Sequence, residues 1–238
     1  MKKVKLVQIK GKVDIYNDKE FIWSPAVANM DRILNNGDKI RTGVLSSAVL
    51  TFEDGSQVSV RPNSEIEIKR CVYDLRNNTL YSKISLLRGN VNYKTRDNMP
   101  VKVVNEIECL DSIIEFGGNL SASMLLDGTI KYELYFGTAN LIAYNEKTVI
   151  PPASGVYIFP GAAPSKPVKL LDPTILARPM NSVYSRTSAP ELSWQLQTGA
   201  DNYLVQIAED EFFNKLVFEE TVRGSKVKST ALLDGKYF

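Results

Sequence analysis

Four acidic side chains, Asp54, Glu65, Glu67 and Glu115, are the residues of this chain that could carry out chemistry. A glycoside hydrolase needs two carboxyl groups and no histidine. Glu65 and Glu67 are two residues apart, and in a β-strand this spacing puts both side chains on one face, about 7 Å apart. Alternating glutamates are also the ordinary solvent face of a half-buried sheet, and the sequence favours this interpretation over catalysis.

Other catalytic and metal chemistry lacks the residues that it needs. The chain has no histidine, which excludes Ser-His-Asp hydrolases, Cys-His proteases and His-ligated zinc enzymes. Cys71 and Cys109 fit no zinc or redox spacing, and they are either two buried thiols or one disulfide. The segment at residues 53–56 has too few carboxylates for a calcium loop. We therefore expect no cofactor, no metal site and no enzymatic activity.

The charge balance and hydropathy describe a folded chain without a nucleic-acid partner. Its 238 residues contain 29 Lys and Arg against 27 Asp and Glu, so the net charge of +2 gives no basic field for DNA or RNA. No stretch approaches the roughly 20 apolar residues that span a bilayer. The N-terminal segment alternates like a strand and lacks the apolar run of a secretory signal, which leaves open a signal or anchor removed ahead of Val4.

Short β-strands and tight turns must position these side chains. Apolar residues alternate with period two along most of the chain and helical spacing does not persist, which predicts an all-β fold. The Asp-Gly pairs that begin at Asp54, Asp127 and Asp234 are typical of hairpin turns. The residues expected to form one buried face across the first of these turns are Ala48, Leu50, Phe52, Val58 and Val60.

Prolines indicate a boundary between two domains. Eight of the eleven prolines lie between residues 151 and 190, a density that is incompatible with central strands and favours an extended connector. We expect a first β domain over residues 1–164, a Pro-rich linker over residues 165–185 and a second β domain over residues 186–238. The only helix candidate, at residues 210–215, amounts to a single turn at most.

An ordered series of turn and strand-end residues runs through the first domain. These motif residues are Gly37, Asp38, Arg41, Thr42, Gly43, Asp54, Gly55, Ser56, Pro62, Asn63 and Ser64. With Trp23-Ser-Pro25-Ala26 before them and Leu87-Arg-Gly89-Asn-Val91 after them, they resemble the FecR family over residues 4–160. The chain departs from the family pattern at residues 115–119, where Glu-Phe-Gly-Gly-Asn stands in place of the usual Arg-Gly-Thr.

The motif residues also have a structural interpretation that does not depend on the family. Gly37 and Asp38 indicate a turn in which the carboxylate accepts backbone N–H groups. Arg41 either pairs with a buried carboxylate such as Asp38 or Asp54, or faces a ligand. Pairing is favoured because a buried unpaired arginine is costly. We therefore expect the motif to be chiefly architectural.

The second domain carries Pro190-Glu-Leu-Ser-Trp194 and then an alternating strand at residues 203–208. These segments resemble the first part of a fibronectin type III-like sandwich, of the kind that follows envelope-associated domains in bacterial proteins. The resemblance implies that Trp194 and Tyr203 belong to the sandwich core. It also implies that the last strands are missing after Phe238, so an open sheet edge could pair with a second copy and give a homo-oligomer.

The FecR resemblance implies a periplasmic or cell-envelope location. In the founding members, a FecR-like region receives a signal from an outer-membrane receptor and passes it to a cytoplasmic sigma-factor system. This chain lacks the transmembrane and anti-sigma helices of those regulators, so we expect a non-enzymatic binding, scaffold or signal-sensing module whose partner is an envelope protein or peptidoglycan. The alternative is a truncated regulator of a sigma-factor or iron-uptake pathway, and glycan binding or hydrolysis is less favoured.

Overall fold

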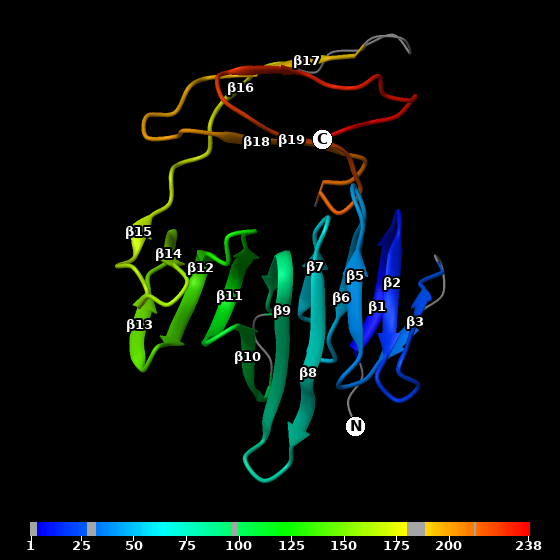
Figure 1. Cartoon of the computed structure of the whole chain (residues 1–238), viewed down its shortest axis with the longest axis vertical. Coiled ribbons are helices and arrows are strands. Elements are labelled where there is room, and N and C mark those ends of the chain that lie inside the picture. The colour runs from blue at the N-terminus through cyan, green and yellow to red at the C-terminus, as the bar shows by residue number, and fades with distance from the viewer. Residues whose placement is uncertain (1–3, 28–31, 97–99, 180–188, 212) are drawn as a thin grey trace. The chain divides into compact units, whose positions relative to one another are not determined.

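The computed structural model describes residues 4–27, 32–96, 100–179, 189–211 and 213–238 (Figure 1). These residues form strands and turns, which confirms the predicted all-β class. No helix capable of spanning a membrane occurs among them. The chain divides into two compact units, Met1–Leu170 and Leu171–Phe238.

The first unit is one branched sheet of short and long strands. Its strands are β1 (Val4–Lys10), β2 (Val13–Asn17), β3 (Ile22–Pro25), β4 (Arg32–Leu34), β5 (Lys39–Thr42), β6 (Ser47–Thr51), β7 (Gln57–Val60), β8 (Glu65–Asp74), β9 (Thr79–Lys94), β10 (Lys102–Cys109), β11 (Ser112–Met124), β12 (Ile130–Ala143), β13 (Glu146–Ile150), β14 (Ser154–Ile158) and β15 (Val168–Lys169).

The three longest strands, β9, β11 and β12, each belong to two branches of this sheet. β9 pairs with β8 through residues 79–88 and with β7 through residues 91–94. β11 pairs with β10 through residues 112–116 and with β9 through residues 119–124, and β12 changes its partner from β14 to β13 in the same way. One branch thus contains β3, β2, β5, β8, β10 and β13, and the other contains β4, β1, β6, β7, β14 and β15.

Glycines occupy the place where β11 and β12 change partners. Gly118 of β11 and Gly137 of β12 lie opposite each other, with φ angles of 121° and 104°. A Cβ atom on either residue would overlap the backbone of the other strand. The Gly117-Gly118 step, where the sequence departs from the FecR pattern, therefore allows the two strands to approach closely.

The buried faces of both branches form one hydrophobic core. All five residues predicted to pair across the Asp54-Gly55 hairpin are buried in it, with Ala48 opposite Val60 and Leu50 opposite Val58. Phenol groups inside this core have hydrogen-bond partners. The Tyr93 hydroxyl donates to Asn105 Oδ1 at 2.9 Å, and Tyr132 shares a 2.8 Å bond with Ser112.

Both cysteines are buried, and neither belongs to a disulfide. Cys71 lies opposite Ser82 of β9, whereas Glu108, the neighbour of Cys109, lies opposite Ser85 of the same strand. Two strand spacings and four residues along β9 thus separate the cysteines, a distance of about 16 Å. A disulfide requires Cα atoms within about 7 Å, so of the two alternatives the structure selects the thiols.

The second unit contains two small sheets around a core of its own. β16 (Leu176–Arg178), β17 (Glu191–Trp194) and β20 (Lys226–Lys228) form one sheet, and β18 (Tyr203–Ala208) and β19 (Leu216–Val222) form the other. The buried residues of the core are Leu192, Trp194, Val205, Ile207 and Phe218. The ring centroids of Trp194 and Tyr203 are 5.4 Å apart. The fibronectin type III assignment stays a prediction.

Local expectations in the second unit have different outcomes. The described residues of segment 210–215 form a turn and no helix, in line with the expectation of a single turn at most, and the Asp210 carboxylate accepts the N–H groups of Asn214 and Lys215 there. The Asp234-Gly235 pair is a bend without a strand after it, so no hairpin forms there. Phe238 exchanges backbone hydrogen bonds of 2.9 and 3.1 Å with Ala208, which covers part of the β18 edge that was expected to be open.

The expected linker, residues 165–185, contains two very short strands. β15 pairs with β14 and belongs to the first unit, and β16 pairs with β17 in the second. Residues 180–188, which include the end of this linker and the start of the expected second domain, lie outside the described residues. The division at residues 164 and 185 therefore stays a prediction.

Candidate functional site

Asp38 and Gly37 of the motif fix the turn before β5. The Asp38 carboxylate accepts the N–H groups of Asp18 at 3.0 Å and Asn35 at 2.8 Å. Gly37 has a φ of 91° and donates its N–H to the Ile68 carbonyl at 2.7 Å. A Cβ atom on Gly37 would lie 2.6 Å from the Asp18 side chain, so no larger residue fits there without movement.

Thr42 and Ser64 tie three segments of the first unit together. The Thr42 hydroxyl donates to the Arg61 carbonyl at 2.6 Å and accepts the Ser64 N–H at 3.0 Å. The Ser64 hydroxyl accepts the Asn90 N–H at 2.8 Å and lies 3.1 Å from the Pro62 carbonyl. These buried hydroxyls therefore join the end of β5, the loop before β8 and the place where β9 changes partners.

The remaining turn residues of the motif close two tight loops. Asn63 has a φ of 55° and donates its N–H to the Gly43 carbonyl at 3.1 Å. Asp54 accepts the N–H of Ser56 at 2.9 Å and its hydroxyl at 2.7 Å, and Gly55 between them has a φ of 81°. Their polar groups are thus engaged within the backbone turns that they shape.

Arg41 is the motif residue whose side chain lies on the outer face of the sheet. Its Nε is 3.0 Å from the Asp14 carboxylate, and its guanidinium carbon is 4.2 Å from the centroid of the Trp23 ring. The expected partners, Asp38 and Asp54, are wrong, because both carboxylates are used in turns. Asp14 is the partner because it lies directly opposite Arg41 in the pairing of β2 with β5.

The strand register extends this contact into a face of alternating charge. One cross-strand row runs from Asp14 through Arg41 and Glu65 to Arg88. The adjacent row contains Trp23, Tyr16, Lys39 and Glu67. These eight residues, here called the Trp23–Arg41 face, come from β2, β3, β5 and β8 of one branch and from the shared strand β9.

Contacts between neighbours hold the side chains of this face in place. The Trp23 and Tyr16 ring centroids are 5.4 Å apart, and the Lys39 ammonium lies 5.3 Å from the Tyr16 ring. Arg88 approaches Glu65 to 3.4 Å. Exposed ion pairs stabilise a fold by about 1 kcal/mol at most, so their main effect here is to orient the face rather than to hold the sheet together.

The arrangement suits binding better than catalysis. Glu65 is paired with Arg88, and Glu67 with Lys69 at 3.0 Å, whereas a glycosidase needs one of its two carboxyls protonated. Asp54 lies in a turn of the other branch and Glu115 on β11, so the four acids are not gathered. Among the described residues, no cluster of acidic or thiol side chains could hold a metal ion. Tryptophan, tyrosine and arginine are the residue types that dominate protein interfaces.

The contributions of Asp14, Tyr16 and Trp23 were not predicted. Their signal in the sequence is a set of similar triplets, each with an isoleucine between two polar or aromatic residues: Asp14-Ile-Tyr16, Lys39-Ile-Arg41 and Glu65-Ile-Glu67. Each triplet turns its isoleucine into the core and its flanking residues outward. Their alignment depends on pairing between distant segments, which no local pattern specifies.

The fold and the face define an all-β module with an ordered, charged and aromatic outer surface. The sequence family described as FecR protein matches residues 38–114, which is less than half of the chain and lies within the range expected from the motif. The matched range includes five of the eight residues of the Trp23–Arg41 face, namely Lys39, Arg41, Glu65, Glu67 and Arg88.

Solved structures resemble the chain only at low sequence identity. Two crystal structures of a protein from Parabacteroides distasonis ATCC 8503, assigned as an anti-sigma factor, are similar to the chain with 9% and 8% identity and TM-scores of 0.45. Each alignment covers 56% of this chain and 59% of the other. No curated protein matched the sequence.

Proposed function

We propose that this protein is a non-enzymatic, signal-receiving module of sigma-factor regulation in the bacterial cell envelope. The observation that carries the proposal is the FecR match over residues 38–114, which contains every motif residue except Gly37 and most of the Trp23–Arg41 face. Of the two expected roles, scaffold and regulator, the match supports the regulator. The module would act by contact with a partner protein.

The geometry of Arg41 explains why this face is suited to a protein partner. The Arg41 side chain is 40% exposed, while the Asp14 side chain that it contacts is only 12% exposed. The more buried carboxylate therefore holds the guanidinium in place, and part of the guanidinium stays accessible to a partner. A side chain that is ordered before binding loses less conformational entropy in the complex. Trp23 beside it supplies the apolar area that anchors an interface.

The test is binding of envelope proteins by the immobilised 238-residue chain, compared with three variants. Trp23→Ala and Arg41→Glu remove the aromatic anchor and reverse the central charge. Tyr157→Ala is the matched control, because Tyr157 also lies under a cation, Lys131 at 5.1 Å, but on the other branch. Circular dichroism and thermal unfolding establish that all three variants are folded.

We expect the native chain and Tyr157→Ala to retain the same envelope signalling protein. Trp23→Ala should weaken that binding by about 2 kcal/mol or more, roughly thirtyfold in affinity. Retention by purified peptidoglycan alone would instead support an envelope scaffold. Equal binding by Trp23→Ala and the native chain would refute this face as the interface.

A further inference from the structure

β13 is an edge strand of the first unit and lies at the margin of the sheet in Figure 1. It pairs with β12 and with no other strand, and the register between the two strands contains no bulge. Within the described residues, the other strands that end a branch are β3, β4 and β15, which have four, three and two residues, whereas β13 has five. Of these strands, β13 therefore offers the longest open edge.

The backbone groups of Lys147 and Val149 point away from the sheet. The two-residue turn at residues 144–145 has φ angles of 50° and 63°, and in such a hairpin the residues that flank the turn form a hydrogen-bonded pair. Hydrogen-bonded pairs alternate along an antiparallel ladder, so Thr148 bonds to β12 while Lys147 and Val149 direct their N–H and C=O groups outward. These outward groups have no backbone partner within the described part of the chain.

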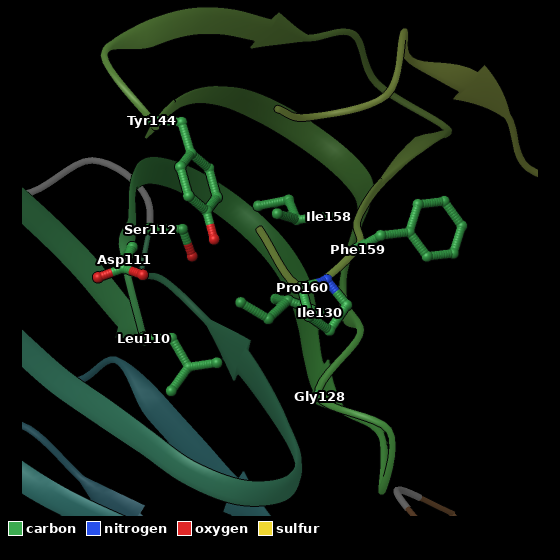
Figure 2. A pocket seen from close by; sticks show the side chains of 9 residues that line it. All are labelled: Leu110, Asp111, Ser112, Gly128, Ile130, Tyr144, Ile158, Phe159 and Pro160. Carbon is green, nitrogen blue, oxygen red and sulfur yellow. The ribbon is translucent and has the colours of Figure 1, made fainter. Parts of the chain in front are cut away.

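Contacts on its other sides hold β13 in place. Ile150 is buried in the hydrophobic core, and the Tyr144 hydroxyl accepts the Gly161 N–H at 3.1 Å. Figure 2 shows Tyr144 near Ser112 and Ile158, at a hollow that has room for about one water molecule. The hollow is too small for a ligand, but these contacts fix both ends of β13. A strand that is ordered before binding loses less conformational entropy in a complex.

The side chains beside this edge are apolar or cationic. Val149 is 69% exposed, and it lies diagonally across from the exposed Ile142, which is itself opposite the exposed Ile113. Lys147 is exposed and has no ion-pair partner among the described residues. A strand added at this edge would therefore gain most from an apolar side chain opposite Val149 and an acidic side chain opposite Lys147.

A second copy of β13 does not supply these side chains. Between two such edges in antiparallel pairing, Lys147 can lie opposite Val149, opposite a second Lys147, or opposite Pro151, which has no N–H to donate. None of these registers gives the lysine an acid. Lysine on an edge strand is a common device against pairing between copies.

We propose that β13 accepts an extended segment of a partner protein as an additional antiparallel strand. Residues opposite Val149 and Lys147 are two positions apart in the partner, so the segment has the order apolar, any residue, acidic. Main-chain hydrogen bonds to the outward groups of β13 provide the affinity, and the two side chains provide the selectivity. This proposal does not depend on the function proposed for the Trp23–Arg41 face.

The test is an NMR titration of the full chain with short capped peptides. The first peptide has Val-Thr-Glu between threonine flanks, the second has Val-Thr-Lys, and the third is the first with an N-methyl group on its valine. We expect the first peptide to shift the amide signals of Lys147 and Val149 and to slow the exchange of these amides with solvent. The amide of Thr148, which already bonds to β12, should change less.

The other two peptides separate side-chain selectivity from main-chain bonding. The Val-Thr-Lys peptide should bind up to about fivefold more weakly, since it loses an exposed ion pair. The N-methyl peptide should bind roughly tenfold more weakly, because it cannot donate the hydrogen bond to the Val149 carbonyl.

Variants of the chain test the edge itself. Val149→Pro removes one outward N–H and leaves the bonds to β12 in place, because proline is tolerated where the N–H of an edge strand faces solvent. It should abolish the peptide-induced shifts. Val149→Thr is the matched control, which keeps the N–H and should bind within about fivefold of the native chain. Lys147→Glu should reverse the preference between the glutamate and lysine peptides, a result that does not depend on the folding of the proline variant.

Three outcomes would overturn the proposal. They are the absence of shifts at Lys147 and Val149 with the first peptide, equal binding of its N-methyl form, and shifts that persist in a folded Val149→Pro variant. A concentration-dependent dimer that disappears in Val149→Pro would also overturn it, because a second copy of the chain would then occupy the edge.

Discussion

Cys109 is the thiol whose reactivity the fold changes most clearly. Burial raises its pKa to about 12, so almost no thiolate is present near neutral pH. We expect neither Cys109 nor the buried Cys71 to react with Ellman's reagent at pH 8 in the native protein. Two thiols should appear when the same reagent is added in denaturant without reductant. A titre of zero in denaturant would show that a disulfide exists after all.

The same buried groups make the fold sensitive to alkali. The pKa of Cys109 is higher in the folded chain, at about 12, than its ordinary value of 9.0, so the folded state holds the proton more tightly. The stability from this difference is complete below pH 9 and is lost as pH rises toward 12. Burial also raises the pKa of Tyr93, which acts in the same direction. We expect the urea midpoint to fall between about pH 9 and 11, and to fall less in Cys109→Val.

The kinds of residue at the candidate site were more predictable than their partners. Asp38 and Asp54 were expected to serve turns, and their short-range hydrogen bonds can be anticipated from aspartate beside glycine. The pairing of Arg41 with Asp14 spans 27 residues of sequence and arises only when β2 and β5 come together. Residue type therefore indicated that Arg41 needs an acid, but not which one.

At the scale of the elements, the crossing of β11 and β12 depends on particular glycines. Gly137→Ala would place a Cβ atom in the backbone of Gly117 and Gly118, and its φ is positive as well. We expect a loss of about 3 kcal/mol or more in the free energy of unfolding. Gly117→Ala is the control, because no atom lies within 4 Å of the position that its Cβ would occupy. It should change stability by less than about 1 kcal/mol.

Chemical denaturation followed by far-UV circular dichroism measures both variants. Equal midpoints for Gly137→Ala and Gly117→Ala would contradict the close approach of the two strands. An unfolded Gly137→Ala beside a folded Gly117→Ala would agree with it.

The strands were largely predictable and their branching was not. Alternation with period two reveals which residues face inward, as at Ala48, Leu50 and Phe52, because a strand turns successive side chains to opposite faces. The same rule cannot say that β9 pairs with β8 along one half and with β7 along the other, since that choice depends on packing over the whole unit. The hairpin expected at Asp234 failed for a related reason: the segments on its two sides form no strand pair.

At the scale of the whole molecule, the two tryptophans report on different units. Trp23 belongs to the first unit, and Trp194 belongs to the core of the second. Trp194→Ala should destabilise the second unit by about 3–5 kcal/mol, because a large buried side chain is removed. The unfolding followed by Trp23 fluorescence should keep its midpoint.

Leu204→Ala is the matched control, because Leu204 lies on β18 but is largely exposed. It should leave the unfolding of the second unit nearly unchanged. If the second unit of the Trp194→Ala variant unfolded at the same urea concentration as in the native chain, the assignment of Trp194 to its core would be contradicted.

The sharing of β9, β11 and β12 between branches determines how the first unit opens to solvent. If one branch unfolded while the other stayed folded, the hydrogen bonds of these strands would break along only part of each strand. The single hydrophobic core that the two branches share would also become exposed to solvent. Slowly exchanging amides should therefore have nearly the same protection free energy in both halves of each long strand. The first unit would then open as one cooperative body, and hydrogen exchange measured along β9 on either side of Gly89 would reveal it.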